Sequence, residues 1–422
     1  LQEHEEKISI IKEGKLAEQT RHPDPLEWID NYRKQFSVPE IDNSPRFIGG
    51  LVGYFGYDTI RYIEPRLGKN NKPDEFGNAD IMLMLSTEFL VFDNLKGSVY
   101  IIVLAGCETE DNFNRAQQRI NDIATELQEN ISLAPLDVAR DNVRELDFVS
   151  GFSEQGFKEA VIKAKDYITA GDVMQVVLSQ RLNAKFKGKS IDVYRYLRRL
   201  NPSPYMYYLN MGDFEIVGSS PEILVRQDSQ EVTVRPIAGT RPRGKNEQQD
   251  QALEEELLAD PKELAEHLML IDLGRNDIGR IATIGSVELT EKMIVERYSH
   301  VMHIVSNVKG ILAPGQSCID VLRATFPAGT VSGAPKIRAM EIIDELEPIK
   351  RGVYSGAVGY ISWQGDMDTA IAIRTAVIKD GTISVQAGAG IVYDSVPDNE
   401  WIETLNKAKA VLRAAALAEE VA

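Results

Sequence analysis

Acidic residues stand three positions apart in two segments of the chain, a spacing that brings carboxylates onto one face of a helix. Glu263 and Glu266 follow a proline that fits the first turn of a helix, and Glu263 is placed to complete a capping box with Asp260. Glu400 and Glu403 repeat the spacing near the C-terminus. Taken alone, the two segments predict a capped helix and a solvated acidic face. If the two helices faced each other, their glutamates would supply the oxygen ligands that Mg²⁺ binds. The spacing by itself does not establish that the helices face each other.

The same two helices need apolar residues that hold them against a core. Residues three or four positions apart predict such a stripe on each helix. The stripes consist of Leu264, Leu268 and Ile271 in the first helix and of Ile402, Leu405, Ala408 and Leu412 in the second, which is expected to start near Asp398. Lys407 lies one turn after Glu403, where a surface ion pair is the simplest interpretation.

A histidine and a loop of small residues are further candidates. His303 lies in a strand predicted over 298–309, on the face of Val301 and Val305. A histidine there is more often a core residue, although imidazole can also act as an acid or base near neutral pH. The loop 326–336 leads into a predicted helix, whose free N–H groups suit an anion; a plain capped helix is the alternative. This loop lacks the spacing of a P-loop.

An arginine among alanines is the strongest single sign of a ligand. The pattern over 369–378 predicts one strand in which Arg374 shares a face with three alanines, and a buried guanidinium needs an anionic partner. Gly388 and Gly390 lie in the next strand, where glycine often marks close approach to a ligand. A structural ion pair is the alternative, and we favour the ligand. Together these features predict a small anionic substrate held by Arg374, backbone donors and a carboxylate-bound metal.

The elements that must position these residues alternate between strands and helices. Hairpin turns are predicted at 93–97, 364–366 and 379–381. Antiparallel hairpins interleaved with helices predict an α+β fold rather than a Rossmann sheet, and no G-x-G-x-x-G motif follows a strand. The polar stretch 129–150 is weakly periodic and is predicted to link an N-terminal domain, residues 1–145, to a catalytic domain, residues 146–422.

The composition excludes several classes of protein. The 422 residues carry a formal net charge of −17, which argues against a general nucleic-acid binder and against a polybasic membrane-surface protein. Apolar runs have strand length, and the N-terminal residues lack the pattern of a signal peptide, so we expect no membrane span. Cys107 and Cys318 are too few for a disulfide framework. A cytoplasmic protein is the simplest expectation.

The motifs resemble those of the chorismate-utilising enzymes, most closely the aminase subunits of anthranilate synthases. The segments that carry the resemblance are 235–244, 266–277, 301–303, 325–336, 351–356 and 388–390. The resemblance covers 150–415 and, more weakly, 25–130. It implies an α/β-layered fold with two β-sheets packed face to face and helices outside. It also implies a Mg²⁺-dependent lyase that converts chorismate and ammonia into anthranilate and pyruvate, the first committed step of tryptophan biosynthesis.

The resemblance implies roles for individual residues. Glu266 and Glu403 match the Mg²⁺ ligands, with Glu263 and Glu400 in support. Glu263 also matches the candidate acid for the departing hydroxyl, and His303 matches the catalytic histidine that assists pyruvate elimination. The remaining matches lie against the substrate: Thr330 beside the ring, and Gly239, Thr240, Tyr354, Arg374, Gly388, Gly390 and Lys407 as binding residues.

Two positions distinguish the reactions within this family. Water-using relatives, the isochorismate and salicylate synthases, carry a lysine where Gln175 stands here. Aminodeoxychorismate synthases typically carry a lysine nucleophile where Ala238 stands here. Both positions favour direct addition of ammonia. Aminodeoxychorismate synthesis is the close alternative, and a catalytically silent sensor of chorismate or tryptophan is an alternative of a different class.

The resemblance further implies a partner and an inhibitor. The cysteine-bearing motif of a glutamine amidotransferase is absent from the sequence, so ammonia is expected from a separate amidotransferase subunit. Half of the family's tryptophan site is matched by Pro204, Tyr205, Met206, Val358 and Tyr360. The Leu-Leu-Glu-Ser element that forms the other half is not found. A truncated N-terminal domain or an incomplete regulatory site is therefore predicted.

Overall fold

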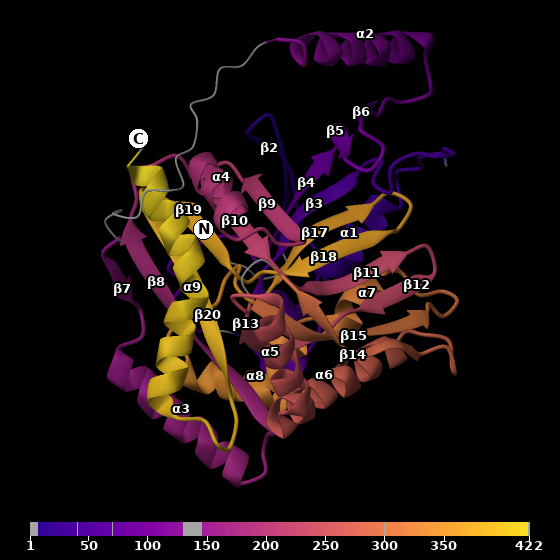
Figure 1. The fold of residues 1–422 in the computed structure, drawn as a ribbon. Helices are drawn as coiled ribbons and strands as arrows, with labels where there is room; N and C mark the ends of the chain where they lie inside the picture. The colour runs from indigo at the N-terminus through magenta and orange to yellow at the C-terminus, as the bar shows by residue number, and fades with distance from the viewer. Residues whose placement is uncertain (1–6, 40, 70, 130–145, 299–300, 421–422) are drawn as a thin grey trace.

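Two large antiparallel β-sheets form the centre of the protein in a computed structural model that describes residues 7–39, 41–69, 71–129, 146–298 and 301–420 (Figure 1). The nine-stranded sheet contains β13 (Ile237–Pro242), β15 (Val301–Ile311), β12 (Glu231–Val234), β11 (Ile223–Asp228), β18 (Met367–Ile371), β17 (Ala357–Ser362), β3 (Gly50–Phe55), β4 (Ile81–Ser86) and β14 (Glu288–Arg297). The seven-stranded sheet contains β16 (Gly333–Ala334), β8 (Gln175–Lys185), β20 (Thr382–Ile391), β19 (Thr375–Lys379), β10 (Glu215–Ser220), β9 (Tyr205–Asn210) and β7 (Phe148–Ser150).

Helices cover the outer faces of the sheets, while apolar side chains fill the space between them. Tyr54 and Val358 of the nine-stranded sheet share a buried cluster with Ile216 and Val377 of the seven-stranded sheet. The helices are α1 (Pro25–Arg33), α2 (Glu110–Glu126), α3 (Glu154–Thr169), α4 (Ser190–Leu200), α5 (Glu247–Ala259), α6 (Pro261–Gly279), α7 (Cys318–Thr325), α8 (Lys336–Leu346) and α9 (Pro397–Glu419). Short 3₁₀ turns are η1 (Tyr57–Tyr62), η2 (Pro65–Leu67) and η3 (Gly329–Val331). This arrangement confirms the predicted α+β fold.

The N-terminal part of the chain joins the same architecture. Strands β3 and β4 extend the nine-stranded sheet through pairing of β3 with β17. Two separate hairpins are β1 (Lys7–Lys12) with β2 (Lys15–Arg21) and β5 (Glu88–Asp93) with β6 (Ser98–Val103). Most of the predicted linker, 130–145, lies outside the described residues, so the division into two domains stays a prediction. None of the described helices has the length and apolar character that crossing a membrane requires.

The predicted single strand over 369–378 is wrong. The chain ends β18 at Ile371, leaves the nine-stranded sheet and begins β19 at Thr375 in the seven-stranded sheet. Arg374 lies in this crossing with φ of 52°, in the left-handed region that residues with a side chain rarely adopt. Strand alternation holds only within a continuous strand, so Arg374 does not share a face with the neighbouring alanines as predicted. The crossing instead places it at the junction of the two sheets.

The predicted apolar stripes of the two acidic helices are partly wrong. Leu268 of α6 is 48% exposed and Ile402 of α9 is 52% exposed. Helix α9 packs on β20 through smaller residues, including Thr404 and Ala408, because small side chains let the helix approach the sheet closely. Helical spacing predicted the helices but not which neighbouring face would be buried.

Candidate active site

Arg374 lies buried at the junction of the sheets. Its backbone carbonyl accepts from the N–H of Ser219, which fixes the crossing of the chain. Within the described ranges its side chain forms no hydrogen bond or ion pair, and burial lowers the pKa of the guanidinium. Tyr354, Glu222 and Glu403 lie near enough to favour its charged form without being bonded to it. A buried guanidinium that has no bonded anionic partner among the described residues is suited to bind an anion.

His303 faces the same junction from β15. Its Nδ1 lies 3.0 Å from the carbonyl oxygen of Gly239 and 3.1 Å from Oγ1 of Thr240, which stands opposite it on β13. Because a carbonyl oxygen only accepts, Nδ1 carries the hydrogen and Nε2 keeps its lone pair in the neutral ring. Burial lowers the pKa of His303, and the charge of Arg374 acts in the same direction. The neutral imidazole is therefore suited to accept a proton at Nε2.

The acidic residues of α6 and α9 do face each other. Burial raises the pKa of Glu266, and the nearby carboxylates of Glu263 and Glu403 raise it further. The amide of Gln175 donates to Glu266 Oε1 over 2.7 Å and lowers this pKa. Burial also raises the pKa of Glu400, with Glu403 again contributing repulsion. Glu403 of α9 thus lies close enough to Glu266 of α6 for the two carboxylates to repel each other. A cation between such carboxylates relieves this repulsion.

The predicted capping box of α6 does not form. Asp260 caps the helix by accepting from the N–H groups of Lys262 and Glu263. The Glu263 carboxylate instead accepts from Arg241 over 3.1 Å, because β13 brings that guanidinium beside the start of the helix. Glu263 is therefore turned toward the site, with Oε2 beside Gly239.

The carboxylates fit a Mg²⁺ that keeps part of its water shell better than a fully protein-bound ion. Among the residues that the structure describes, no group of three or more acidic, histidine or cysteine side chains converges closely enough to enclose a metal. Glu403 forms an ion pair of 2.6 Å with Lys407. Mg²⁺ characteristically binds through one or two carboxylates together with waters and substrate oxygens. The donor set is thus chemically suitable for Mg²⁺, with Glu266 and Glu403 as the facing pair.

Two glycines of β20 make the wall of the site next to these helices. The carbonyl of Gly388 accepts from Nζ of Lys407 over 2.8 Å, which brings α9 and β20 together. A Cβ atom at Gly388 would lie 2.6 Å from the hydroxyl of Tyr354, and one at Gly390 would lie 2.7 Å from the amide of Gln175. Tyr354, Lys407 and both glycines therefore line one surface. The absence of side chains at the two glycines suits close approach of a ligand to this wall.

Gly388→Ala is expected to raise KM for the substrate by about tenfold, because the new Cβ would displace the wall that binds it and a loss of about 1.4 kcal/mol in binding corresponds to a factor of ten. The new Cβ would meet the rigid carbonyl of Leu178 at 2.9 Å as well as Tyr354. Steady-state kinetics checks this. Gly279→Ala is the matched control, since a Cβ there meets nothing within 4 Å. An unchanged KM in Gly388→Ala would contradict the placement of this wall.

Glu222 is a site residue that the sequence analysis missed. It lies just before β11, is 6% exposed and forms no ion pair within the described part of the chain. Burial raises its pKa to about 8, although hydrogen bonding by the Thr330 hydroxyl and by the backbone of Ile237, together with the charges of Arg374 and Lys407, acts in the opposite direction. A glutamate inside an apolar, Ser-Pro-flanked segment was the signal in the sequence that could have identified it.

The residues matched to a tryptophan site are only partly brought together. The hydroxyl of Tyr205 donates to Oδ1 of Asp368 over 2.8 Å, and Asp368 stands opposite Tyr360 on the neighbouring strand. Met206 packs toward the cluster under α9, whereas Val358 lies in the cluster between the sheets. Pro204 is exposed. The two tyrosines thus share one acidic partner, and the role of the set stays a prediction.

The fold and the site together define a chorismate-binding enzyme. The family described as chorismate binding enzyme matches residues 2–413, and this chain belongs to that family. Anthranilate synthase component 1 of Pseudomonas aeruginosa is 57% identical over 419 residues, which cover 99% of this chain and 85% of that relative. The protein of the same name from Neisseria meningitidis serogroup C is 54% identical over 416 residues, covering 98% of this chain and 84% of the relative.

Solved structures agree with this assignment. The crystal structure of anthranilate synthase component I from Streptococcus pneumoniae is 42% identical with a TM-score of 0.85, and the match covers 96% of this chain and 89% of that chain. The menaquinone-specific isochorismate synthase of Escherichia coli has the same fold, with a TM-score of 0.73 and 21% identity. The match covers 92% of this chain and 82% of that chain. The resemblance inferred from the motifs is confirmed.

Proposed function

We propose that this chain is the aminase component of an anthranilate synthase, a lyase that converts chorismate and ammonia into anthranilate, pyruvate and water. The observation that carries the proposal is the guanidinium of Arg374, which is bonded to none of the described side chains and lies near His303, Glu222 and the Glu403 carboxylate. Arg374 would bind an anion, His303 would act as a base, Glu222 as an acid, and the carboxylates would bind a cation. These groups lie close together in the fold. The relatives at 52–57% identity support the same activity.

The binding groups divide between the two carboxylates of chorismate. Arg374, Tyr354 and the backbone of Gly388 and Gly390 would hold one carboxylate, with Lys407 closing the same wall. Glu266 and Glu403 would hold Mg²⁺, which supplies positive charge to the ring carboxylate when bound. A dianionic substrate thereby finds local positive charge in a protein whose net charge is −17.

The chain's own acid and base account for the proton movements. Ammonia adds at C2 while the C4 hydroxyl departs, and the hydroxyl needs a proton to leave as water. Glu222 is buried and has its pKa raised to about 8, so it is protonated near neutral pH, whereas Glu263 is held in an ion pair with Arg241. We therefore favour Glu222 over Glu263, the acid implied by the resemblance. The lone pair of His303 Nε2 would accept the C2 proton as pyruvate leaves and the ring becomes aromatic.

Gln175 supports ammonia rather than water as the nucleophile. Its side chain donates to Glu266 and lies against Gly390, so the amide spans the site between α6 and β20. An amide is no base at neutral pH, while ammonia needs no base to act as a nucleophile. Ala238 likewise offers no lysine for the covalent route of aminodeoxychorismate synthesis.

The activity assay that tests the proposal combines chorismate, Mg²⁺ and an ammonium salt, with anthranilate detected by its fluorescence. We expect anthranilate without any other protein present, because free ammonia replaces the amidotransferase. A 4-amino product without anthranilate would overturn the proposal in favour of aminodeoxychorismate synthesis. No turnover would favour a sensor.

Glu403→Gln is expected to weaken Mg²⁺ binding by about 10- to 100-fold, because the amide lacks the negative charge that a hard cation prefers. The measurement is the Mg²⁺ dependence of the unfolding temperature, which needs no turnover, followed by the Mg²⁺ dependence of kcat. Glu255→Gln on the exposed surface of α5 is the control and should respond to Mg²⁺ like the wild type. Equal Mg²⁺ responses in all three proteins would refute the assignment.

The partner and regulator are part of the same proposal. An anthranilate synthase component 2, a glutamine amidotransferase, would deliver ammonia in the cytoplasm. Tryptophan would bind near Tyr205 and Tyr360, beside Asp368, which accepts from Tyr205 over 2.8 Å and is paired with Arg226 over 3.0 Å. Inhibition of anthranilate formation by added tryptophan is the direct measurement.

A further inference from the structure

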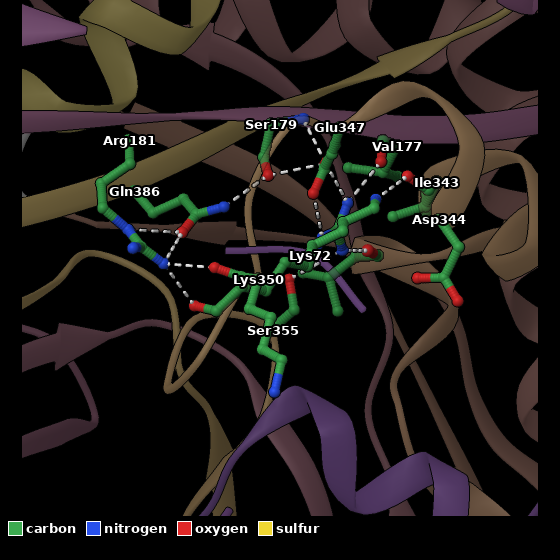
Figure 2. Close-up of polar contacts among 12 residues, drawn as sticks. Lys72, Val177, Ser179, Arg181, Ile343, Asp344, Glu347, Lys350, Ser355 and Gln386 are labelled. Carbon is green, nitrogen blue, oxygen red and sulfur yellow. Dashed lines mark hydrogen bonds and ion pairs between the residues drawn. The ribbon is translucent and has the colours of Figure 1, made fainter. Parts of the chain in front are cut away.

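A fully buried ion pair lies behind the candidate active site and contributes no group to it. Arg351 donates from Nε and one terminal nitrogen to the two carboxylate oxygens of Glu347, over 2.9 and 2.6 Å. The side chains are 1% and 2% exposed. Figure 2 shows Glu347 within a network that also includes Val177, Ser179 and Ser355. Burying two charges is costly, so a pair with so many extra partners is a feature that needs explanation.

The remaining donors of Arg351 reach three separate segments of the chain. They contact the carbonyl of Val331 at 2.7 Å, the carbonyl of Val177 at 2.7 Å and the hydroxyl of Ser355 at 3.1 Å. Every N–H of the guanidinium is therefore used. Glu347 adds a second contact with β8, because its Oε1 accepts from both the N–H and the hydroxyl of Ser179 at 2.8 Å.

Each of these contacts adjoins a residue matched to chorismate binding. Val331 follows Thr330 and Ser355 follows Tyr354 in the sequence. Val177 stands directly opposite Gly390, and Ser179 directly opposite Gly388, in the pairing of β8 with β20. The Tyr354 ring also lies against the Arg351 guanidinium, with its centroid 5.5 Å away. One ion pair thus fixes the neighbours of four substrate residues through contacts with η3, β8 and the loop that contains Ser355.

A second buried arginine provides the comparison. The side chain of Arg33 in α1 is 9% exposed and donates to Oδ1 of Asp30 over 3.3 and 2.9 Å and to the carbonyl of Trp363 over 2.9 Å. Neither acceptor carries or adjoins a residue matched to the substrate. Both arginines are buried and paired with a nearby carboxylate, and they differ in which parts of the chain they contact.

We propose that the Glu347–Arg351 pair is a positioning device for this reaction, which sets Thr330, Tyr354, Gly388 and Gly390 relative to one another. The inference rests on the proposed function. A small displacement of substrate-holding groups costs about 10²-fold in rate, so the pair acts on catalysis without touching the substrate.

The test compares Arg351→Lys with Arg33→Lys, each purified as the full chain and assayed with chorismate, Mg²⁺ and ammonium well below its unfolding temperature. Lysine keeps the charge but cannot span the carbonyls of Val177 and Val331. Both variants should unfold at lower temperature. Only Arg351→Lys should lose kcat/KM, by about 100-fold, while Arg33→Lys stays within about threefold of the wild type. Equal kcat/KM values for the two variants would overturn the inference.

A double-mutant cycle with Tyr354→Phe separates positioning from general destabilisation. If Arg351 acts through Tyr354, the double variant should lose less than the product of the two single losses, and strictly multiplicative losses would overturn the inference. Should Arg351→Lys fail to fold, Ser179→Ala removes one donor to Glu347 and should lower kcat/KM about threefold to tenfold; no change would count against the proposal. An inactive wild type would instead overturn the proposed function, and this inference with it.

Discussion

Arg374→Gln is expected to lower kcat/KM for chorismate by about 10²- to 10³-fold and, at the same time, to raise the temperature of unfolding. In the free protein the Arg374 guanidinium has no hydrogen-bonded partner in the described ranges, so removing it relieves a desolvation cost. In the complex it would pair with a substrate carboxylate, and losing one partner of a buried charge pair costs about 2–5 kcal/mol. Stability and activity should therefore move in opposite directions.

The measurement pairs thermal unfolding with steady-state kinetics. Arg33→Gln is the control, because Arg33 is also buried but donates to Asp30 and to the carbonyl of Trp363. That variant should lose stability and keep its kcat/KM. If Arg374→Gln were instead destabilised as strongly as Arg33→Gln, Arg374 would be a structural residue and the site would need another anion-binding group.

Glu222→Gln is expected to lower kcat by about 10²- to 10⁴-fold, the usual contribution of a general acid. Glutamine has nearly the same shape, so the loss would report the missing proton rather than a cavity. Glu263→Gln is the direct comparison, since Glu263 matches the acid that the resemblance implied. A larger loss in Glu263→Gln than in Glu222→Gln would return the acid role to Glu263.

The pH dependence provides a second measurement on Glu222. Its pKa is raised by burial from 4.5 to about 8, so the proton-donating form is lost as pH rises through about 8, and kcat should fall there in the wild type. The folded state binds this proton more tightly than the unfolded state does. The free energy of unfolding of the wild type, relative to Glu222→Gln, should therefore be constant at low pH and decrease as pH rises from about 4.5 to about 8. A difference that increases over this interval would contradict a buried, protonated Glu222.

Local features of the molecule followed directly from the sequence. Helical spacing predicted α6 and α9, and the cap at Asp260 formed as expected. Hairpin turns and antiparallel strands predicted the α+β class. The motifs predicted the family, and with it the residues to inspect. Each of these properties depends on residues close together in the chain, where backbone geometry and neighbouring side chains decide the outcome.

Other features depended on which distant segments meet. Arg374 was predicted to bind an anion from within a continuous strand. That position was wrong, because the strand ends where the chain passes from one sheet to the other. Glu222 carried no distinctive spacing, and only its burial beside Thr330 gave it a raised pKa. The exposed Leu268 and Ile402 likewise show that helix periodicity defines candidate faces but not the partner that covers one of them.

The sequence by itself therefore determined the types of chemical group available, their local elements and the family that combines them. The tertiary structure alone decided that Glu403 lies close to Glu266 of the other helix, that Glu222 is buried near Arg374, and that the buried Glu347–Arg351 pair holds the surrounding backbone. The physical reason is that burial, pKa and charge repulsion arise from contacts between residues far apart in the chain, such as Arg33 and Trp363, which are 330 positions apart. No local pattern encodes such contacts.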